Sequence, residues 1–366
     1  MATRPLFLTR RFPPSVGGME TLSAGVWRTL STAAPESVLV AHSGSRRALP
    51  LWLPRALIRT SWLLAARRVD LLLTGDAVMC AAARPLARAL RVPCATLVHG
   101  LDLTYDRGRY RSIVHPAVRK ADAVLANSEA TASVARELGV PPDRVHVVRL
   151  GVDAPEVTVA ERVEARGRLG ARLGIGDDDV LLLTLGRLVP RKGVVWFLTN
   201  VLPALPRQAI YVVAGDGEDA ERIRDTIATG RLEARVRVVG QVDDDERELL
   251  FRGADMFVQP NVPVAGDLEG FGLVTVEAAL RDLPVVASDL EGIADAVVDG
   301  VTGTLLPPGD ARVWVDALTT LVADRGQLAE RGRAFGEAAR ARYSERQMGE
   351  QLVRLLGVGE PAVRDS

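Results

Sequence analysis

The chain has 366 residues, a hydrophobic content of 48% and a formal net charge of zero. This length exceeds one ordinary hydrophobic core and predicts about two domains, and the composition indicates a fully globular protein. Its only cysteines, Cys80 and Cys94, lie in apolar stretches, which excludes a disulfide framework or a zinc site and predicts two reduced, buried thiols.

The charges are distributed unevenly along the chain. Residues 1–152 contain 21 Lys and Arg against 10 Asp and Glu, a net charge of +11, so the remainder carries −11. Such asymmetry indicates either that the first half meets an anionic surface or ligand, or that two oppositely charged domains dock on each other. The N-terminal apolar run is too short for a signal peptide or a membrane span, so we expect a cytoplasmic protein.

Short, β-rich apolar runs recur along the chain and alternate with Ala-, Arg- and Leu-rich stretches of helical spacing. This alternation predicts βαβ units with parallel sheets, in which ligands bind beyond the carboxyl ends of the strands. The predicted strands are PLFLT, SVLVAH, DLLLTG, CATLVHG, AVLANS and VHVVRLG in the first half, and VLLLTLG, IYVVAGDG, VRVVG, MFVQP and PVVASD in the second.

The charged stretch VAERVEARGRLGARLGIGDDD separates the two series of strands and contains no strand candidate. We interpret it as a linker with an entry helix. The sequence therefore predicts an α/β fold of two doubly wound, Rossmann-like domains facing each other across a central cleft. The expected domains are residues 1–155 and 175–340, with a C-terminal helix at about 341–366 that packs back on the first domain.

Two sets of residues in the first half follow predicted strands. Gly17 and Gly18, in PPSVGGMET, allow a ligand close to the backbone at a helix start, but the stretch is not GxGxxG, which disfavours a dinucleotide site. His99 and Asp102, in VHGLDL, directly follow another strand. A histidine there can be a ligand-binding residue or a satisfied structural one.

Residues 46–68, RRALPLWLPRALIRTSWLLAARR, combine arginines with Trp and Leu side chains. Pro50 and Pro54 are expected to break the segment, which cannot span a bilayer. Two interpretations remain open. The segment contacts an anionic membrane surface, or it is a crossover helix that packs its Leu and Trp side chains on the first sheet.

In LGRLVPRKG, Arg187 and Lys192 flank a proline-containing turn after the first strand of the second half. Two cations in this place can hold a diphosphate from two sides, and Lys192 is one of only two lysines in the chain. The alternative is a pair of solvated loop charges. The stretch VVAGDGE, residues 212–218, supplies another flexible strand end.

The stretch GDLEGFGLVTVEAA contains two acids, Glu269 and Glu277. Gly270 and Gly272 disfavour a helix between them, so we expect a helix to begin near Gly272. Glu269 then lies just outside the helix N-terminus and Glu277 in the second turn, close to unpaired N–H groups that attract phosphate. The alternative is that Glu269 only complements the helix dipole and Glu277 is solvated.

Seven motifs occur in a fixed order over most of the chain. They are FPPSVGG, GRLVPRKG, AGDGE, GADMFVQP, the E-x7-E pair of Glu269 and Glu277, PVVASDLEGIADAV and DGVTGTLLPPGD. On these motifs the chain resembles the retaining glycosyltransferases of family 4, which have the GT-B fold. Within that family it is similar to the mannosyltransferases that act on phosphatidylinositol mannosides, which carry similar FPP-x-x-GG and RLVPRKG stretches.

The resemblance implies a role for each matching position. Arg187 and Lys192 would hold the diphosphate of a nucleotide-sugar donor, Glu277 its ribose, and Glu269 the transferred sugar, which His99 would also touch. The further donor contacts that it implies are Gly17, Gly18, Asn127, Ser128, Gly215 and the backbone around Phe271, Gly272 and Leu273.

The implied reaction moves a hexose from GDP-mannose or a UDP-sugar to a hydroxyl of a lipid-linked or small-molecule acceptor. Because the family offers no clear carboxylate behind the anomeric carbon, the resemblance implies a front-face reaction in which the leaving phosphate takes the acceptor's proton. No metal, other cofactor or nucleic acid is expected. The acidic runs at 177–179 and 243–246 are interpreted as solvated loops or helix caps.

Three other functions compete with this interpretation. A phosphorylase shares the fold class but needs a pyridoxal-bearing lysine, for which Lys120 is poorly placed. A sugar-nucleotide epimerase would release a free or inverted sugar without an acceptor, and a non-catalytic sugar-nucleotide binding protein would leave the donor intact. The presence of Arg187, Lys192, Glu269 and Glu277 together favours the transferase.

Overall fold

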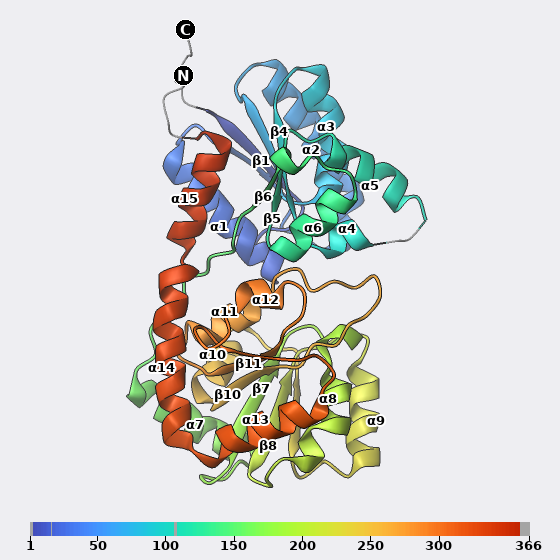
Figure 1. The fold of residues 1–366 in the computed structure, drawn as a ribbon. Helices are drawn as coiled ribbons and strands as arrows, with labels where there is room; N and C mark the ends of the chain where they lie inside the picture. Colours follow the sequence, from blue (N-terminus) through green and yellow to red (C-terminus); the bar gives the residue numbers. More distant parts are fainter. Residues whose placement is uncertain (1–2, 16, 106–107, 359–366) are drawn as a thin grey trace. The chain divides into compact units, whose positions relative to one another are not determined.

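The structure is a computed structural model that describes residues 3–15, 17–105 and 108–358. It divides into two compact units, each an α/β sandwich around one parallel sheet (Figure 1). Unit 1 is formed by Met1–Val152 with Tyr343–Ser366, and unit 2 by Asp153–Arg342.

The sheet of unit 1 has six parallel strands in the order β2-β1-β3-β4-β5-β6. Every residue of β1, β3 and β4 is buried, which explains why these strands read as unbroken apolar runs. All six predicted strands of the first half are confirmed. Their bounds are β1 Pro5–Thr9, β2 Val38–Ala41, β3 Leu71–Thr74, β4 Cys94–Val98, β5 Ala123–Ala126 and β6 Val145–Val147.

Helices cover both faces of this sheet. The helices α2, α3, α5 and α6 share one hydrophobic core with it, and α1 and α15 lie together on the other face (Figure 1). The bounds are α1 Gly18–Ala33, α2 Leu49–Ala65, α3 Ala77–Ala89, α4 Leu101–Thr104, α5 Tyr110–Arg119, α6 Glu129–Glu137 and α15 Glu345–Leu356, with short 3₁₀ turns at Arg46–Ala48 and Pro142–Arg144.

The C-terminal helix α15 is tied to unit 1 by several contacts. Arg28 of α1 forms an ion pair with Glu345, and the N–H of Val152 donates to the carbonyl of Tyr343 at 2.8 Å. Gly349 lies so close to α1 that a Cβ on it would be 2.8 Å from Oγ1 of Thr29. Residues 343–358 therefore complete the packing of unit 1.

The sheet of unit 2 also has six parallel strands, in the order β12-β11-β10-β7-β8-β9. The five predicted strands are confirmed, and β12 was missed because its three residues lie in the Gly- and Pro-rich stretch TGTLLPPG. The bounds are β7 Val180–Leu185, β8 Ala209–Ala214, β9 Val236–Gly240, β10 Met256–Gln259, β11 Val285–Ser288 and β12 Thr304–Leu306.

The core of unit 2 centres on Trp314, which is fully buried and packs edge-on against Phe197 with ring centroids 6.3 Å apart. The helices are α7 Val159–Leu173, α8 Val194–Asn200, α9 Ala220–Gly230, α10 Asp244–Gly253, α11 Leu273–Ala279, α12 Ile293–Ala296, α13 Ala311–Ala323 and α14 Arg325–Arg342, with 3₁₀ turns at Pro190–Lys192 and Leu202–Ala204.

The stretch interpreted as a linker contains α7, which is an integral part of unit 2. Ala165 and Leu169 are buried against α10, and a Cβ on Gly253 would lie 2.6 Å from Cδ1 of Leu169. The expected start of the second domain at residue 175 was therefore placed too late, because the apolar stripe of α7 is short and its remaining surface is charged.

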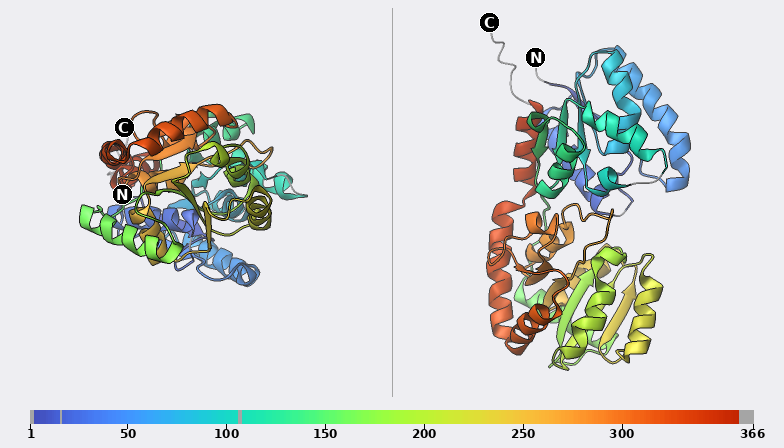
Figure 2. Two further views of the ribbon diagram at one scale, coloured as in Figure 1. Left: turned by 90° about the horizontal axis from the view of Figure 1, so that it is seen from below. Right: turned by 45° about the vertical axis from the view of Figure 1, so that its right-hand side comes forward.

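The prediction that Pro50 and Pro54 break the segment 46–68 is wrong, since α2 is continuous through both. Pro50 lies in the first turn, where its missing N–H costs nothing. Figure 2 shows α2 on the outer side of unit 1. Among the described helices, none combines the length and the hydropathy needed to cross a membrane.

In each sheet, the direction in which successive strands are added reverses at one pair of neighbouring strands. The pair is β1 and β3 in unit 1, and β7 and β10 in unit 2. Loops that leave the carboxyl ends of such a pair run to opposite sides of the sheet and open a crevice between them. These two switch points are therefore where ligand-binding residues are expected within each unit.

Candidate functional site

At the switch point of unit 2, the loop after β7 packs against the loop after β10. Gly193 has a φ of 67°, and a Cβ on it would lie 1.8 Å from the carbonyl oxygen of Pro260. Only glycine fits this close approach. This close packing of the two loops places Lys192, at the end of a 3₁₀ turn, against Glu269. Nζ of Lys192 lies 2.6 Å from Oε2 of Glu269.

Glu269 is 7% exposed, and its carboxylate is surrounded by cations and an amide. Its Oε2 atom accepts from Lys192 Nζ and from Asn261 Nδ2 at 3.1 Å, and lies 3.5 Å from Nε of Arg191. All three contacts involve Oε2. Burial alone would raise the pKa of Glu269, but the charges of Lys192 and Arg191 and the two hydrogen bonds lower it to about 2. Glu269 is therefore an ionised acceptor.

Lys192 and Arg187 differ in their surroundings. Burial lowers the pKa of the Lys192 ammonium, and the nearby charges of Arg191 and Arg187 lower it further. The charge of Glu269 acts in the opposite direction but does not cancel these effects. Arg187 is exposed, and its guanidinium has no hydrogen bond or ion pair within the part of the chain that the structure describes. The loop therefore carries two buried, paired cations, Lys192 and Arg191, and the exposed Arg187, which is unpaired within the described residues.

Helix α11 begins at Leu273 with Gly272 as its N-cap, as the sequence predicts. Glu277 lies in its second turn but is only 6% exposed, so it is not a solvated residue. Its carboxylate forms an ion pair with Arg247 of α10. Phe271 is buried beside the N-cap, and Leu273 is half-buried.

The loop after β8 packs against the loop that carries Arg187. A Cβ on Gly215 would lie 1.8 Å from the carbonyl oxygen of Gly186, and one on Gly217 would lie 2.1 Å from that of Leu188. The glycines of AGDGE therefore allow this loop to support the backbone on both sides of Arg187.

Sequence reasoning missed several residues that surround Glu269. Arg191 pairs with Asp267, with Nη1 3.2 Å from each carboxylate oxygen, and Asn261 contacts Glu269 directly. Glu291, in the left-handed region at a φ of 51°, accepts the N–H of Glu269 at 2.6 Å, and burial raises its pKa. A polar residue directly after a buried strand, as in MFVQPN, is the signal that could have identified Asn261.

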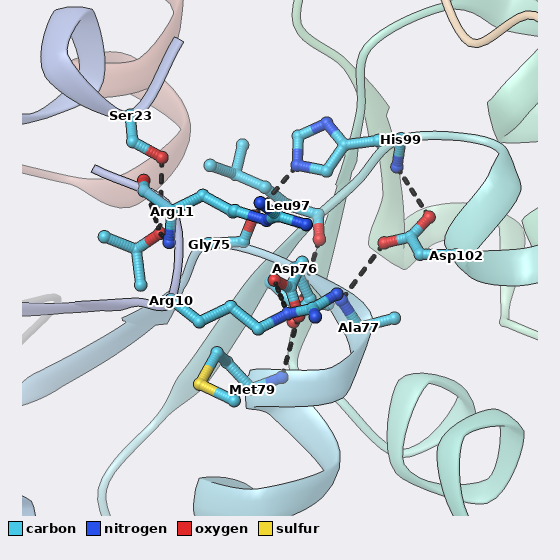
Figure 3. Close-up of polar contacts among 12 residues, drawn as sticks. Arg10, Arg11, Ser23, Gly75, Asp76, Ala77, Met79, Leu97, His99 and Asp102 are labelled. Atoms are coloured by element: carbon cyan, nitrogen blue, oxygen red, sulfur yellow. Dashed lines mark hydrogen bonds and ion pairs between the residues drawn. The ribbon is translucent and has the colours of Figure 1, made fainter. Parts of the chain in front are cut away.

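In unit 1, His99 follows β4 and is fixed by its neighbours (Figure 3). Its N–H donates to Oδ1 of Asp102 at 2.8 Å, and its ring nitrogen Nε2 lies 2.9 Å from the carbonyl oxygen of Gly75. Because a carbonyl only accepts, Nε2 carries the proton and leaves Nδ1 as an acceptor in the neutral ring. Burial raises the pKa of Asp102, whose Oδ2 accepts the N–H of Ala77 at 3.1 Å.

Asp76 and Arg10, which sequence reasoning also missed, join the two strands of this switch point. Asp76 follows β3, is fully buried, and caps α3 by accepting the N–H of Met79 at 2.9 Å. Its Oδ2 atom lies 2.7 Å from Nε of Arg10, which follows β1 (Figure 3). This ion pair holds the loops after β1 and β3 together.

Three further predicted residues lie at the same edge of the sheet. Gly17 is the N-cap of α1, and a Cβ on it would lie 2.5 Å from Oε2 of Glu20. Asn127 is 7% exposed, and its Oδ1 has no hydrogen-bond partner among the described residues. Ser128 is fully buried and uses its hydroxyl to cap α6, so a role in contacting a ligand would fall to its backbone.

The acidic runs at 177–179 and 243–246 contribute side chains that accept backbone hydrogen bonds within unit 2. Asp243 caps α10 by accepting the N–H of Glu246, and Oδ2 of Asp179 accepts the N–H of Gly176. Within residues 3–15, 17–105 and 108–358, no group of three or more His, Cys, Asp and Glu side chains is arranged to hold a metal ion. Cys80 and Cys94 are buried free thiols, as predicted.

Two family descriptions match the chain. Residues 167–342 match "Glycosyl transferases group 1", and residues 27–155 match "Glycosyltransferase Family 4". Together the two matches cover most of both units.

Curated relatives point the same way. A "D-inositol 3-phosphate glycosyltransferase" of Xylanimonas cellulosilytica is 34% identical over 286 residues, 74% of this chain and 66% of the relative. A "GDP-mannose-dependent alpha-(1-6)-phosphatidylinositol monomannoside mannosyltransferase" of Mycolicibacterium smegmatis is 28% identical over 92% of both chains. The chain spans about half to two thirds of the length of the first curated relatives it matches.

Solved structures share the fold at low identity. Anabaena Alr3699/HepE in complex with UDP has a TM-score of 0.77 at 19% identity and covers 97% of this chain and 100% of its own. The catalytic domain of Starch Synthase IV from Arabidopsis thaliana, bound to ADP and acarbose, has a TM-score of 0.78 at 13% identity, with 98% and 99% covered.

Proposed function

The chain belongs to glycosyltransferase family 4 and has the GT-B fold, and from this premise we propose that it moves a hexose from a nucleotide-diphosphate sugar to a hydroxyl group with retention at the anomeric carbon. The observation that carries the proposal is the pair of Lys192 and Glu269 with the free cation Arg187 beside it. An ionised acceptor next to an unpaired cation suits a ligand that has hydroxyls at one end and phosphates at the other.

Each residue has a proposed role that follows from its surroundings. Arg187 and Lys192 hold the donor diphosphate, since both are cations at the carboxyl edge of the unit 2 sheet. The ionised carboxylate of Glu269 accepts hydrogen bonds from hydroxyls of the transferred sugar, and Glu277 accepts from the ribose. In unit 1, Nδ1 of His99 accepts from a further sugar hydroxyl.

The proposed chemistry is a front-face substitution. As the bond from the anomeric carbon to the leaving phosphate breaks, negative charge grows on the diphosphate, and Arg187 and Lys192 stabilise it. The leaving phosphate oxygen takes the proton of the attacking hydroxyl, so the new glycosidic bond forms on the same face. We propose that this reaction needs no metal ion.

The names of the relatives suggest the substrates to test. GDP-mannose stands in the name of one relative, and UDP occupies one of the similar structures. Inositol phosphate and phosphatidylinositol glycans are the acceptors that the relatives' names imply. We propose a lipid-linked or small inositol-type acceptor.

The test is a panel of GDP-mannose, UDP-glucose and ADP-glucose with and without inositol 3-phosphate or phosphatidylinositol, in which release of the nucleoside diphosphate and the glycosylated product are both measured. We expect acceptor-dependent release from one donor, unaffected by chelator, and an α-linked product. A free or inverted sugar formed without acceptor would support an epimerase instead. Stabilisation by a donor without any turnover would support a binding protein.

The outer face of α2 suggests where an anionic membrane would bind. Leu51, Ile58 and Trp62 are 69%, 70% and 57% exposed and lie on one face of the helix with the exposed Arg55 and Arg59. A helix that presents apolar and basic side chains together suits the headgroup region of an anionic membrane.

The opposite face of α2 packs on the sheet of unit 1 through Ala56, Thr60, Leu63 and Leu64. Packing on the sheet and binding a membrane therefore do not compete for the same side chains. We propose that the enzyme works in the cytoplasm, peripherally at the inner membrane face.

A further inference from the structure

A cavity of about 310 Å³ lies at the amino edge of the unit 1 sheet, where α3 ends and β4 and β5 begin. It is lined by Arg84, Arg88, Arg91, Val92, Pro93, Cys94 and Asp122. His99 and Asn127 follow the other ends of the same two strands, so the length of β4, about 16 Å at 3.3 Å per residue, separates this cavity from them. The cavity is therefore distinct from the candidate donor-binding residues.

Three arginines dominate the lining. Arg84, Arg88 and Arg91 are spaced at i, i+4 and i+7, so they share one side of α3 and its C-terminal end, where like charges repel. None of them forms an ion pair with an acid in the part of the chain that the structure describes. Arg88 and Arg91 are exposed, and Arg84 is half-buried.

The rest of the lining does not neutralise these charges. Asp122 is the one acid of the lining, and its Oδ2 already accepts the N–H of Cys94 at 2.8 Å. A hydrogen bond with Cys80 and burial raise the pKa of the Cys94 thiol, so it stays neutral. The lining therefore carries three positive charges against one negative charge.

Two of the arginines are held by backbone geometry. Nε of Arg84 donates to the carbonyl oxygen of Lys120 at 2.6 Å, which fixes the guanidinium and leaves its two Nη groups available. Arg91 has a φ of 55° at the end of α3, and the next residue, Val92, closes the helix by donating to Ala87 at 2.9 Å. The guanidinium of Arg84 and the backbone of Arg91 are therefore fixed at the rim of the cavity.

We propose that this cavity binds a phosphate group, presented either by a soluble phosphate ester or by an anionic lipid headgroup. A planar guanidinium matches two phosphate oxygens at once, and three guanidinium groups around one cavity can satisfy a dianion. The volume lies at the lower end of small-molecule sites, roughly 300–1,000 Å³. The inference goes beyond the proposed glycosyl transfer and does not depend on it.

The experiment is a calorimetric titration of the full chain with inorganic phosphate. It is done in an Arg187→Ala background, which weakens phosphate binding at the donor site. The test variant is Arg88→Ala with Arg91→Gly, because glycine keeps the left-handed backbone while it removes the charge. The matched control is Arg222→Ala with Arg224→Ala, which removes two exposed arginines from α9, a helix with no proposed binding role.

We expect the Kd for phosphate to rise at least tenfold in the test variant and to stay unchanged in the control. Hydrogen exchange of residues 84–94 in the wild-type chain should also slow when phosphate is added. An unchanged Kd in the test variant, or no protection of residues 84–94, would overturn the proposal.

The source of the phosphate is distinguished with phosphatidylcholine vesicles prepared with and without phosphatidylinositol. If binding to the inositol-lipid vesicles falls in the Arg88 and Arg91 variant as free phosphate binding does, the cavity takes a headgroup. If only free phosphate binding falls, it takes a soluble ester. If neither depends on these arginines, the proposal is wrong.

Discussion

The ammonium group of Lys192 lies 2.6 Å from Oε2 of Glu269, and both residues are more than nine-tenths buried. Arg187, at the other end of the same loop, is exposed and unpaired within the described residues. The two cations that the proposed mechanism uses on one diphosphate therefore have different effects on the free protein. Lys192 contributes to the stability of the fold, and Arg187 is available to bind a ligand.

Replacing each cation by alanine should separate these effects. Both Lys192→Ala and Arg187→Ala should lower kcat/KM by roughly 10²–10³, as loss of a charge-stabilising group does. Only Lys192→Ala should also lower the free energy of unfolding, by about 3 kcal/mol, because it leaves Glu269 buried with less compensation. Steady-state kinetics and urea unfolding measure the two. Activity within tenfold of wild type in either variant would contradict its role in binding the diphosphate.

The acid limb of the stability curve should contain a contribution from Glu269. Its pKa is lowered to about 2 from 4.5, so its contribution is present above pH 4.5 and is lost as the pH falls toward 2. This loss should be on the order of 3 kcal/mol. Urea unfolding between pH 2 and pH 6 measures it, and Glu269→Gln should have a flatter curve. Equal slopes in both proteins would refute the assignment.

His99 should hold its proton on Nε2 when its ring is neutral, because Nε2 faces the carbonyl oxygen of Gly75. Long-range ¹H–¹⁵N correlation spectra report this tautomer directly, and a proton on Nδ1 would rule out the proposed role of Nδ1 as acceptor. His99→Ala should lower kcat/KM by roughly threefold to tenfold, the effect of one neutral hydrogen bond.

Gly215→Ala should displace the loop of Arg187, since the new Cβ would lie 1.8 Å from the carbonyl oxygen of Gly186. We expect a loss of about 3 kcal/mol in the free energy of unfolding and weaker binding of nucleotide. Gly309→Ala is the matched control, because Gly309 also has a positive φ, 77°, but nothing lies within 4 Å of its added Cβ. It should cost only about 1 kcal/mol, with nucleotide binding unchanged. Similar losses in both variants would contradict the packing argument.

Anionic liposomes should bind the chain through α2. Replacing Arg55 and Arg59 by Glu should reduce cosedimentation at least tenfold, because each arginine near an anionic surface contributes about 1 kcal/mol. Binding of the wild-type chain should fall as added salt screens the charges. The same change of charge at the exposed Arg222 and Arg224 of α9 should have little effect. No binding of the wild-type chain at low salt would favour a soluble acceptor.

The sheets could be predicted because parallel strands are buried on both faces and read as apolar runs. PLFLT matches β1 residue for residue, and VLLLTLG extends beyond β7 by one glycine only. The proline rule failed at α2 because Pro54 removes one backbone hydrogen bond, a cost of about 3 kcal/mol, while the buried face of the helix gains more. A rule about one residue could not anticipate the packing of a whole helix.

The charged residues of the candidate site could be predicted from the sequence, but the contacts between their side chains could not. Arg187, Lys192, Glu269 and Glu277 stand in motifs, so their spacing in the sequence identified them. The contacts of Glu269 with Lys192 and Glu291 join three different loops of unit 2, and no spacing along the chain specifies them. Ser128 was predicted to line the donor site, yet directly after a strand it is equally suited to cap a helix, which is what its hydroxyl does.

The packing of α15 on α1 has a consequence for biosynthesis. Unit 2, at 153–342, is continuous in sequence and can complete its contacts as soon as it leaves the ribosome. Unit 1 has to wait for residues 343–358, which are made at least ten to forty seconds after Val152 at roughly 5–20 residues per second. During that interval the side of α1 that Met348 and Gly349 later cover is exposed in the nascent chain. The first unit to be translated is thus the last to be finished.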